Sequence, residues 1–209
     1  MRQDISLRII LVILFLSIFQ SCVNDNFENK LKSGDIIFQT SKSQQSKAIQ
    51  LATHSKYSHV GIIYVEGDNI LVYEAVQPVK LTPLHEWIKR GEKNHFVVKR
   101  LRESDKYLTS DNLLKMKTFG EKYLGKDYDI YFEWSNDRIY CSELVWKIYK
   151  EAIGIEIGKL QTLKEFDLEN EIVKEIMIKR YGESIPLDEK VISPAEMFQS
   201  SKLKTIVEK

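Results

Sequence analysis

Cys141, His59 and Glu74 are three side chains of the types that act together in nucleophilic catalysis. A thiol attacks a carbonyl as its thiolate, and a catalytic thiol is usually paired with a base that a third group orients. Cys141 stands where a helical pattern begins, after the turn-forming residues 135–138, so the helix dipole would favour the thiolate. Backbone N–H groups at that helix start would also stabilise an oxyanion. A plain core cysteine is the alternative, because free cysteine is often buried.

The base and its orienting carboxylate are predicted to lie on one β-hairpin. If Gly67 and Asp68 are its two central turn residues, Glu74 lies opposite Gly61. His59 then points to the same face as Glu74 and sits diagonal to it. A three-residue loop would put the two side chains on opposite faces. A carboxylate in an apolar strand is costly unless it is paired, which favours the pair over a purely structural histidine.

The spacing of apolar residues predicts the elements that must position this pair and the thiol. Strands are expected at 34–40, on both sides of the turn within 55–76, and at 95–101. Helices are expected at 41–53, 82–91, 109–126, 141–154, 163–182 and 193–203. Apolar residues occupy both faces of the hairpin strands, as in strands that are covered on both sides.

Composition indicates one globular domain without a nucleic-acid surface. The chain has 209 residues, of which 43% are hydrophobic and 29% charged, so it can form a core. The 31 basic and 30 acidic residues nearly cancel, which argues against the basic surface that nucleic-acid binding requires. No cysteine or histidine pair has a C-x-x-C, H-x-x-x-H or H-E-x-x-H spacing, so neither a metal nor another cofactor is predicted.

The N-terminus is typical of an exported lipoprotein. Arg2 and Arg8 precede an apolar run over residues 9–19, which is shorter than the roughly 20 residues that span a bilayer. The run ends near Cys22 rather than at an A-x-A-type site. We therefore expect a signal peptide at 1–21, a lipidated Cys22 with a polar tether over 22–33, and the domain at 34–209. The protein would be held at the periplasmic or cell-surface face of a membrane; an uncleaved anchor or a coincidental cysteine is the alternative.

Four stretches resemble a known family. They are "LKSGDIIFQ", "SHVGIIYVEGDNILVYEAV", "GKDYDIYFEWSNDRIYCSELVWKIY" and "ISPAEMF". Together they are similar to the permuted papain-like cysteine amidases of the NlpC superfamily, in the YiiX/YaeF-like branch. The resemblance implies an α+β, circularly permuted papain-like fold, with a mostly antiparallel central sheet packed against helices. It also implies a catalytic triad of His59 from "SHVGI", Glu74 from "YEA" and Cys141 from "YCSELV".

The resemblance further implies a hydrolase or acyltransferase that acts on amide or ester bonds, with a preference for lipid-like or N-acyl substrates. Unpermuted relatives cleave cell-wall peptides, so a cell-wall amidase or endopeptidase is one alternative. A catalytically silent lipid-binding lipoprotein and an adaptor lipoprotein are others. Aromatic residues concentrated in 128–140 would either line an acyl groove or pack in the core. Residues 160–190 match no motif of the family.

Overall fold

The structure is a computed structural model that describes residues 26–209. The predicted signal peptide, the lipidation site Cys22 and the first part of the predicted tether lie outside the described residues. Within residues 26–209, no helix is both long enough and apolar enough to cross a membrane.

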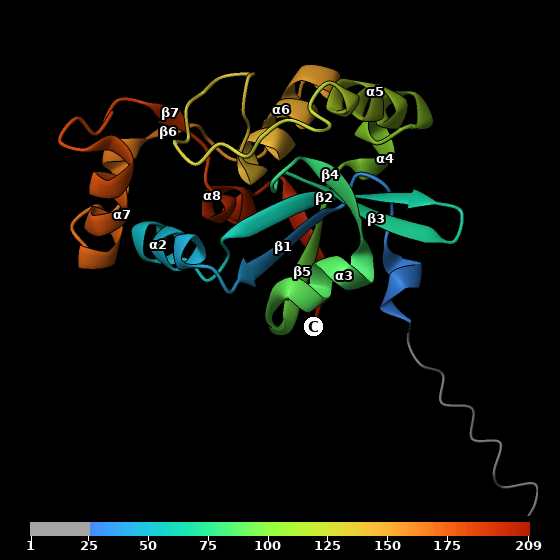
Figure 1. Cartoon of the computed structure of the whole chain (residues 1–209). Coiled ribbons are helices and arrows are strands. Elements are labelled where there is room, and N and C mark those ends of the chain that lie inside the picture. The colour runs from blue at the N-terminus through green and yellow to red at the C-terminus, as the bar shows by residue number, and fades with distance from the viewer. Residues whose placement is uncertain (1–25) are drawn as a thin grey trace, which may run out of the picture.

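An antiparallel sheet forms the centre of the molecule (Figure 1). Its strands are β1 (Ile36–Ser41), β2 (His59–Glu66), β3 (Asn69–Glu74), β4 (Lys80–Pro83), β5 (Gly91–Leu101) and β8 (Leu203–Glu208). They are arranged in the order β4-β3-β2-β1-β5-β8. The predicted strands are confirmed, whereas β4 and β8 were not predicted, because each is a short edge strand in which polar residues interrupt the apolar pattern. Two further strands, β6 (Gln161–Thr162) and β7 (Lys190–Val191), pair outside this sheet.

Helices surround the sheet and, with the loops that connect them, account for the remaining chain. They are the α-helices α2 (Gln44–Thr53), α3 (Leu84–Arg90), α4 (Ser104–Tyr107), α5 (Ser110–Glu121), α6 (Cys141–Ile153), α7 (Glu171–Tyr181) and α8 (Pro194–Gln199), and the 3-10 helices η1 (Phe27–Lys30) and η2 (Leu163–Glu165). The helix predicted over 163–182 is wrong in its first part. Asn170 caps α7 by accepting a hydrogen bond from the N–H of Ile172 at 3.1 Å, so the helix begins only after it.

Apolar side chains cover both faces of the sheet, as predicted for the hairpin strands. Ile36 and Phe38 of β1 pack in the cluster that includes the buried face of α6. Ile37, between them in the chain, packs instead with Trp87 of α3. This alternation follows from the period of two in a strand. The mixed, mostly antiparallel α+β architecture expected from the resemblance is therefore observed.

The hairpin of β2 and β3 has the predicted turn. Glu66 pairs with Asn69 across the two-residue turn, and the register continues to the pair of Ile62 and Tyr73. The next step of that register places Gly61 opposite Glu74. A Cβ atom added at Gly61 would lie 2.5 Å from Cγ1 of Val72, so the close approach of the two strands requires glycine here.

Residues at the start of the described chain pack on the sheet. The ring of Phe27 lies 5.2 Å from that of Phe96, and Leu31 is buried. The hydroxyl of Ser33 accepts a hydrogen bond from the N–H of Val65 at 2.9 Å. The part of the predicted tether from Phe27 to Ser33 therefore contacts the domain, because its apolar side chains complete the cluster on the α3 face.

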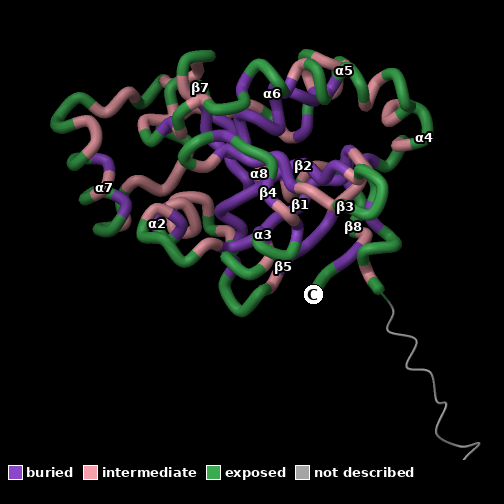
Figure 2. The backbone as a smooth tube through the Cα atoms, turned by 45° about the vertical axis from the view of Figure 1, so that its right-hand side comes forward, coloured by how far each residue is buried: buried purple, intermediate pink, exposed green. Residues whose placement is uncertain are grey.

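A separate layer lies beside the sheet, where α7 runs next to α2 (Figure 1). A small apolar cluster joins the two helices to the strands β6 and β7. Its buried members are Ala48, Leu163, Val173, Met177 and Val191. In Figure 2 the tube is mostly buried in the sheet and α6, and mostly exposed or intermediate along α7.

Candidate active site

The hairpin brings His59 and Glu74 together. Nε2 of His59 lies 2.6 Å from Oε2 of Glu74, and both side chains are buried. The other carboxylate oxygen, Oε1, accepts a hydrogen bond from Oγ1 of Thr82 at 2.6 Å and one from the guanidinium of Arg90. Both oxygens of Glu74 are therefore occupied, and its orientation toward the imidazole is fixed.

Thr82 and Arg90 were missed by the sequence reasoning. Thr82 belongs to β4, which pairs with β3 and so places the hydroxyl beside Glu74. Arg90 ends α3, and Trp87 of the same helix lies under the His59 ring, with the centroids 5.9 Å apart and the planes at 24°. A carboxylate buried in an apolar strand signals several partners, but only the fold shows which residues supply them.

Cys141 is the first residue of α6, as predicted, and it is buried. Its thiol interacts with the His59 ring and with the backbone N–H groups of Val60 and Ser142. Because Nε2 of His59 faces Glu74, the other ring nitrogen, Nδ1, is the one available to the sulfur. The three predicted residues are thus contiguous in the order thiol, imidazole, carboxylate.

The environment favours an ion pair between Cys141 and His59. Burial raises the pKa of the Cys141 thiol, but hydrogen bonding and charge from His59, with the two N–H groups, outweigh burial and lower that pKa. Burial likewise lowers the pKa of His59, but the interactions with Cys141 and Glu74 raise it to about 9. Both shifts act in the same direction, toward a thiolate beside an imidazolium.

The C-terminal "ISPAEMF" segment holds the start of α6. The hydroxyl of Ser142 donates a hydrogen bond to the carbonyl of Ile192 at 2.7 Å. The N–H of Ile192 in turn donates to the hydroxyl of Tyr140 at 3.1 Å. These two bonds flank Cys141, so a segment 50 residues away in the chain fixes the position of the sulfur.

Tyr128 is a further polar group at the thiol. Its hydroxyl accepts a hydrogen bond from Nε2 of Gln45 at 2.9 Å and also interacts with Cys141. Burial and the nearby charge of Cys141 raise the pKa of Tyr128 well above its usual value, so the phenol keeps its proton. Since it accepts from Gln45, that proton is free to be donated toward the sulfur or toward a bound oxygen.

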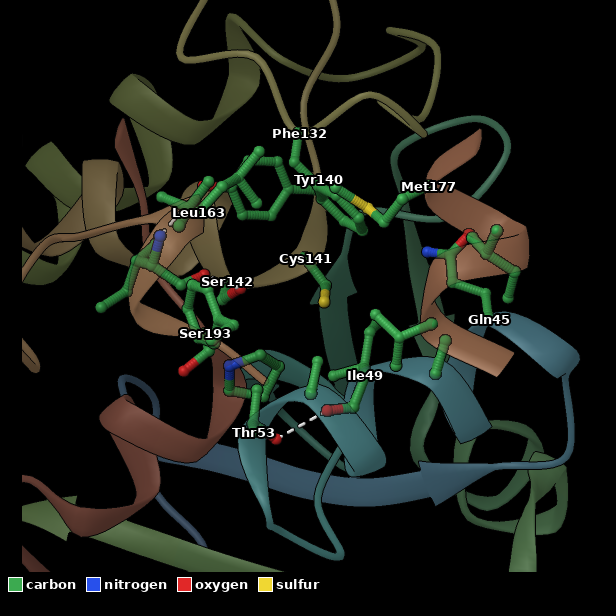
Figure 3. Close-up of a pocket in the computed structure, with 18 of the residues that line it drawn as sticks. Gln45, Ile49, Thr53, Phe132, Tyr140, Cys141, Ser142, Leu163, Met177 and Ser193 are labelled. Carbon is green, nitrogen blue, oxygen red and sulfur yellow. Dashed lines mark hydrogen bonds between the residues drawn. The ribbon is translucent and has the colours of Figure 1, made fainter. Parts of the chain in front are cut away.

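An apolar cavity of about 90 Å³ opens beside Cys141 (Figure 3). Its walls come from α2, from the loop before α6, and from the segment that contains α7. The apolar lining residues include Ala48, Ile49, Phe132, Leu163, Phe166, Val173, Ile176 and Met177. Figure 3 shows Phe132, Tyr140 and Met177 on one side of the sulfur and Ile49 on the other.

The cavity shows the location of two segments that the sequence left open, the aromatic residues in 128–140 and residues 160–190. Of the aromatic residues in 128–140, Tyr128, Phe132 and Tyr140 line it, whereas Tyr131 and Trp134 pack elsewhere: Tyr131 against Tyr181 and Trp134 against Trp146. Residues 160–190, which match no motif quoted for the family, supply one whole wall.

Comparison with known proteins identifies the family. The family model of the permuted papain-like amidases, the YaeF/YiiX C92 family, matches residues 30–207. The chain belongs to this family. The uncharacterized protein YiiX of Escherichia coli K12 is 49% identical over 175 residues, which cover 84% of this chain and 85% of that protein. The resemblance predicted from the sequence is confirmed.

A solved structure extends the comparison to the fold. The crystal structure of a protein described as metalloprotein yiiX, from Escherichia coli O157:H7, matches with a TM-score of 0.82 at 48% identity. The match covers 86% of this chain and 98% of that one. The permuted papain-like fold is therefore shown, and membership of this amidase family supports a cysteine hydrolase kind of activity.

The described part of this chain does not fit a metal centre. Among residues 26–209, no group of three or more His, Cys, Asp or Glu side chains is placed to hold a metal ion. At the candidate active site, Glu74 already binds His59, Thr82 and Arg90, which leaves only the thiol and the imidazole as ligands. Protein metal sites generally use more protein ligands than two.

Proposed function

We propose that this protein is a cysteine hydrolase that removes an acyl group from an amide or ester bond, with Cys141, His59 and Glu74 as its catalytic triad. The observation that carries the proposal is the thiol of Cys141, which interacts with a buried, oriented imidazole and lines an apolar cavity. A merely structural cysteine requires neither the base nor the cavity.

In the proposed mechanism, the Cys141 thiolate attacks the substrate carbonyl and forms a tetrahedral intermediate. The N–H of Cys141, which begins a helix and has no partner within it, and the hydroxyl of Tyr128 donate to the oxyanion. The His59 imidazolium gives its proton to the departing amine or alcohol as the bond to the carbonyl breaks. Neutral His59 then takes a proton from water, whose oxygen attacks the acyl-enzyme and releases the acid and the thiolate. Glu74 keeps the ring oriented throughout.

The cavity supports a lipid-like acyl substrate over a cell-wall peptide. Its lining is mostly aliphatic and aromatic, and it includes Cys141. Burying an alkyl chain there contributes about 0.8 kcal/mol for each methylene removed from water. A polar peptide would leave its amide groups without hydrogen-bond partners against such walls.

A lipid-like substrate also agrees with the proposed lipidation of Cys22, which would hold the domain at a membrane face. Membrane attachment would then concentrate the enzyme and its substrate on one surface. Metabolic labelling with an alkyne fatty acid, compared between the full chain and Cys22→Ala, tests this part separately. Equal labelling of the two proteins would contradict lipidation at Cys22.

The direct test of the proposed activity is to trap the acyl-enzyme. Purified protein is exposed to panels of N-acyl amino acids, phospholipids and cell-wall peptides and is then analysed by intact-protein mass spectrometry. We expect an adduct of the acyl mass on Cys141 with lipid-like substrates, and none with Cys141→Ser. An adduct with cell-wall peptides alone would overturn the proposed substrate class, and none under any condition would overturn the proposed activity.

A further inference from the structure

Arg180 is the one basic residue among those that line the apolar cavity. It lies near the C-terminal end of α7 and is half-buried. Burial lowers the pKa of Arg180, because water is replaced by a less polar environment around the charge. A guanidinium in such a place is costly unless an anion compensates it.

The protein provides Arg180 with neutral partners. Its Nη2 donates a hydrogen bond to Oε1 of Gln45 at 2.9 Å, and its guanidinium carbon lies 5.3 Å from the centre of the Phe132 ring. Among residues 26–209, no carboxylate lies within 4.0 Å of it. The nearby Asp129 instead accepts hydrogen bonds from the N–H groups of Tyr131 and Glu133. The positive charge in the cavity therefore has no direct ion-pair partner among the described residues, and the charge of Asp129 acts on it only from a longer distance.

Hydrogen bonds connect Arg180 to the reacting sulfur. Arg180 donates to Gln45, Gln45 donates to the hydroxyl of Tyr128 at 2.9 Å, and Tyr128 contacts Cys141. The guanidinium is thus two side chains away from the thiol, on the wall formed by α7. A charged group bound there would share the cavity with the bond that Cys141 attacks.

We propose that Arg180 binds an anionic group of the substrate, a carboxylate or a phosphate, located next to the scissile amide or ester bond. The inference rests on the proposed function and deepens it: the substrates are acidic acyl conjugates, whose apolar chain occupies the cavity and whose anion pairs with Arg180. A guanidinium is well suited to this role, because its planar set of donors matches carboxylate and phosphate oxygens.

The test compares pairs of ligands in which one member carries an anionic group and the other does not. One pair is N-lauroylglycine with its neutral analogue N-lauroylglycinamide, and the other is N-lauroyl-O-phosphoethanolamine with neutral N-lauroylethanolamine. Dissociation constants are measured by calorimetry on the Cys141→Ser protein, which cannot turn them over, alone and combined with Arg180→Gln or Arg180→Lys. The comparison uses the ratio of the dissociation constants of the two ligands in a pair. This ratio is unaffected if a fraction of the variant molecules is unfolded.

With Arg180 present, we expect the anionic member of at least one pair to bind roughly 10- to 100-fold more tightly, as for a charge-assisted hydrogen bond in a half-buried site. The pair with the larger ratio identifies carboxylate or phosphate as the anion. Arg180→Gln should bring the ratio close to one, and Arg180→Lys should retain part of it. The matched control is Lys179→Gln, an exposed cation of the same helix outside the cavity, which should leave the ratio unchanged.

Two results would overturn the inference. One is a ratio near one for both pairs with Arg180 present, and the other is a ratio that Arg180→Gln does not alter. Neither result bears on the acyl-enzyme, which is detected on the Cys141 protein by mass spectrometry. Conversely, the protein could bind the anionic ligands more tightly while no acyl-Cys141 is detected. That result would support the anion site and overturn the proposed hydrolase activity, so the two proposals can fail separately.

Discussion

The sheet with α6 and the outer wall formed by residues 160–190 differ in how firmly they are held. Every residue from Cys141 to Tyr149 of α6 is buried, and the polar groups at the site each have several partners. In α7, only Val173 and Met177 are buried, and Ile178 is 60% exposed (Figure 2). Both regions meet at the same cavity.

This difference separates two tasks. The triad requires fixed geometry, because misplacement of reacting groups by about 1 Å is costly, and the sheet provides that rigidity. The wall formed by residues 160–190, which would contact the proposed substrate chain, is joined to the rest by a small apolar cluster. We call the sheet with α6 the framework. Substitutions in the framework should therefore change the rate of the chemical step. Substitutions in the wall formed by residues 160–190 should change which substrate is used.

The largest expected effect is from Cys141→Ala. Removal of the nucleophile should lower turnover at least about 10³-fold, because no acyl-enzyme can form. The thermal unfolding midpoint should change little, since only one sulfur atom is lost from the core. Turnover is measured with the substrate identified by mass spectrometry. More than about a hundredth of the original rate would show that the sulfur is not the nucleophile.

Glu74→Gln should have the next largest effect, a loss of about 10² to 10⁴ in kcat, because the imidazole loses the charge that orients it and raises its pKa. The control is Glu66→Gln on the same hairpin, which removes only an exposed ion pair with Lys117. It should leave kcat within about twofold. Equal effects of the two substitutions would remove Glu74 from the mechanism.

The pH dependence tests the ion pair inside the framework. The pKa of His59 is raised to about 9, so the imidazolium persists at neutral pH and is lost as pH rises through that value. Because protonated His59 supplies the leaving group's proton, kcat should fall above pH 9 by about tenfold per unit. In Glu74→Gln this alkaline limb should move to lower pH, since the carboxylate charge is gone. An alkaline limb that is the same in both proteins would contradict the assignment.

The smallest effect is expected in the wall. Met177→Ala enlarges the cavity and should shift the preferred acyl chain to a longer one, changing kcat/KM by a few-fold and leaving alkylation of Cys141 unchanged. It should also cost about 2 kcal/mol of stability, as for other buried methionines. Ile178→Ala, on the exposed side of the same helix, is the control. If chain preference moved equally in both, the wall would not select the chain.

The framework and the wall formed by residues 160–190 also differ in how well their structure could be predicted from the sequence. Helix α6 and the hairpin were predictable because their periodic patterns and turn residues are local signals. The edge strand β4 carries no such signal, and therefore the Thr82 partner of Glu74 was missed. In residues 160–190, the apolar spacing suggested one long helix, but Asn170 caps a shorter one. Only Val173 and Met177 of this helix are buried, so its apolar pattern is weak.

The sequence by itself determined the pairing of His59 with Glu74, because a two-residue turn fixes which strand residues share a face. It also placed Cys141 at a helix start, since the apolar stripe begins there. Only the tertiary structure decided that thiol and imidazole meet, that Thr82 and Arg90 hold the carboxylate, and that Arg180 lies in the cavity. These contacts join elements that are far apart in the chain. Which of these elements meet in space is set by tertiary packing rather than by local conformational preference.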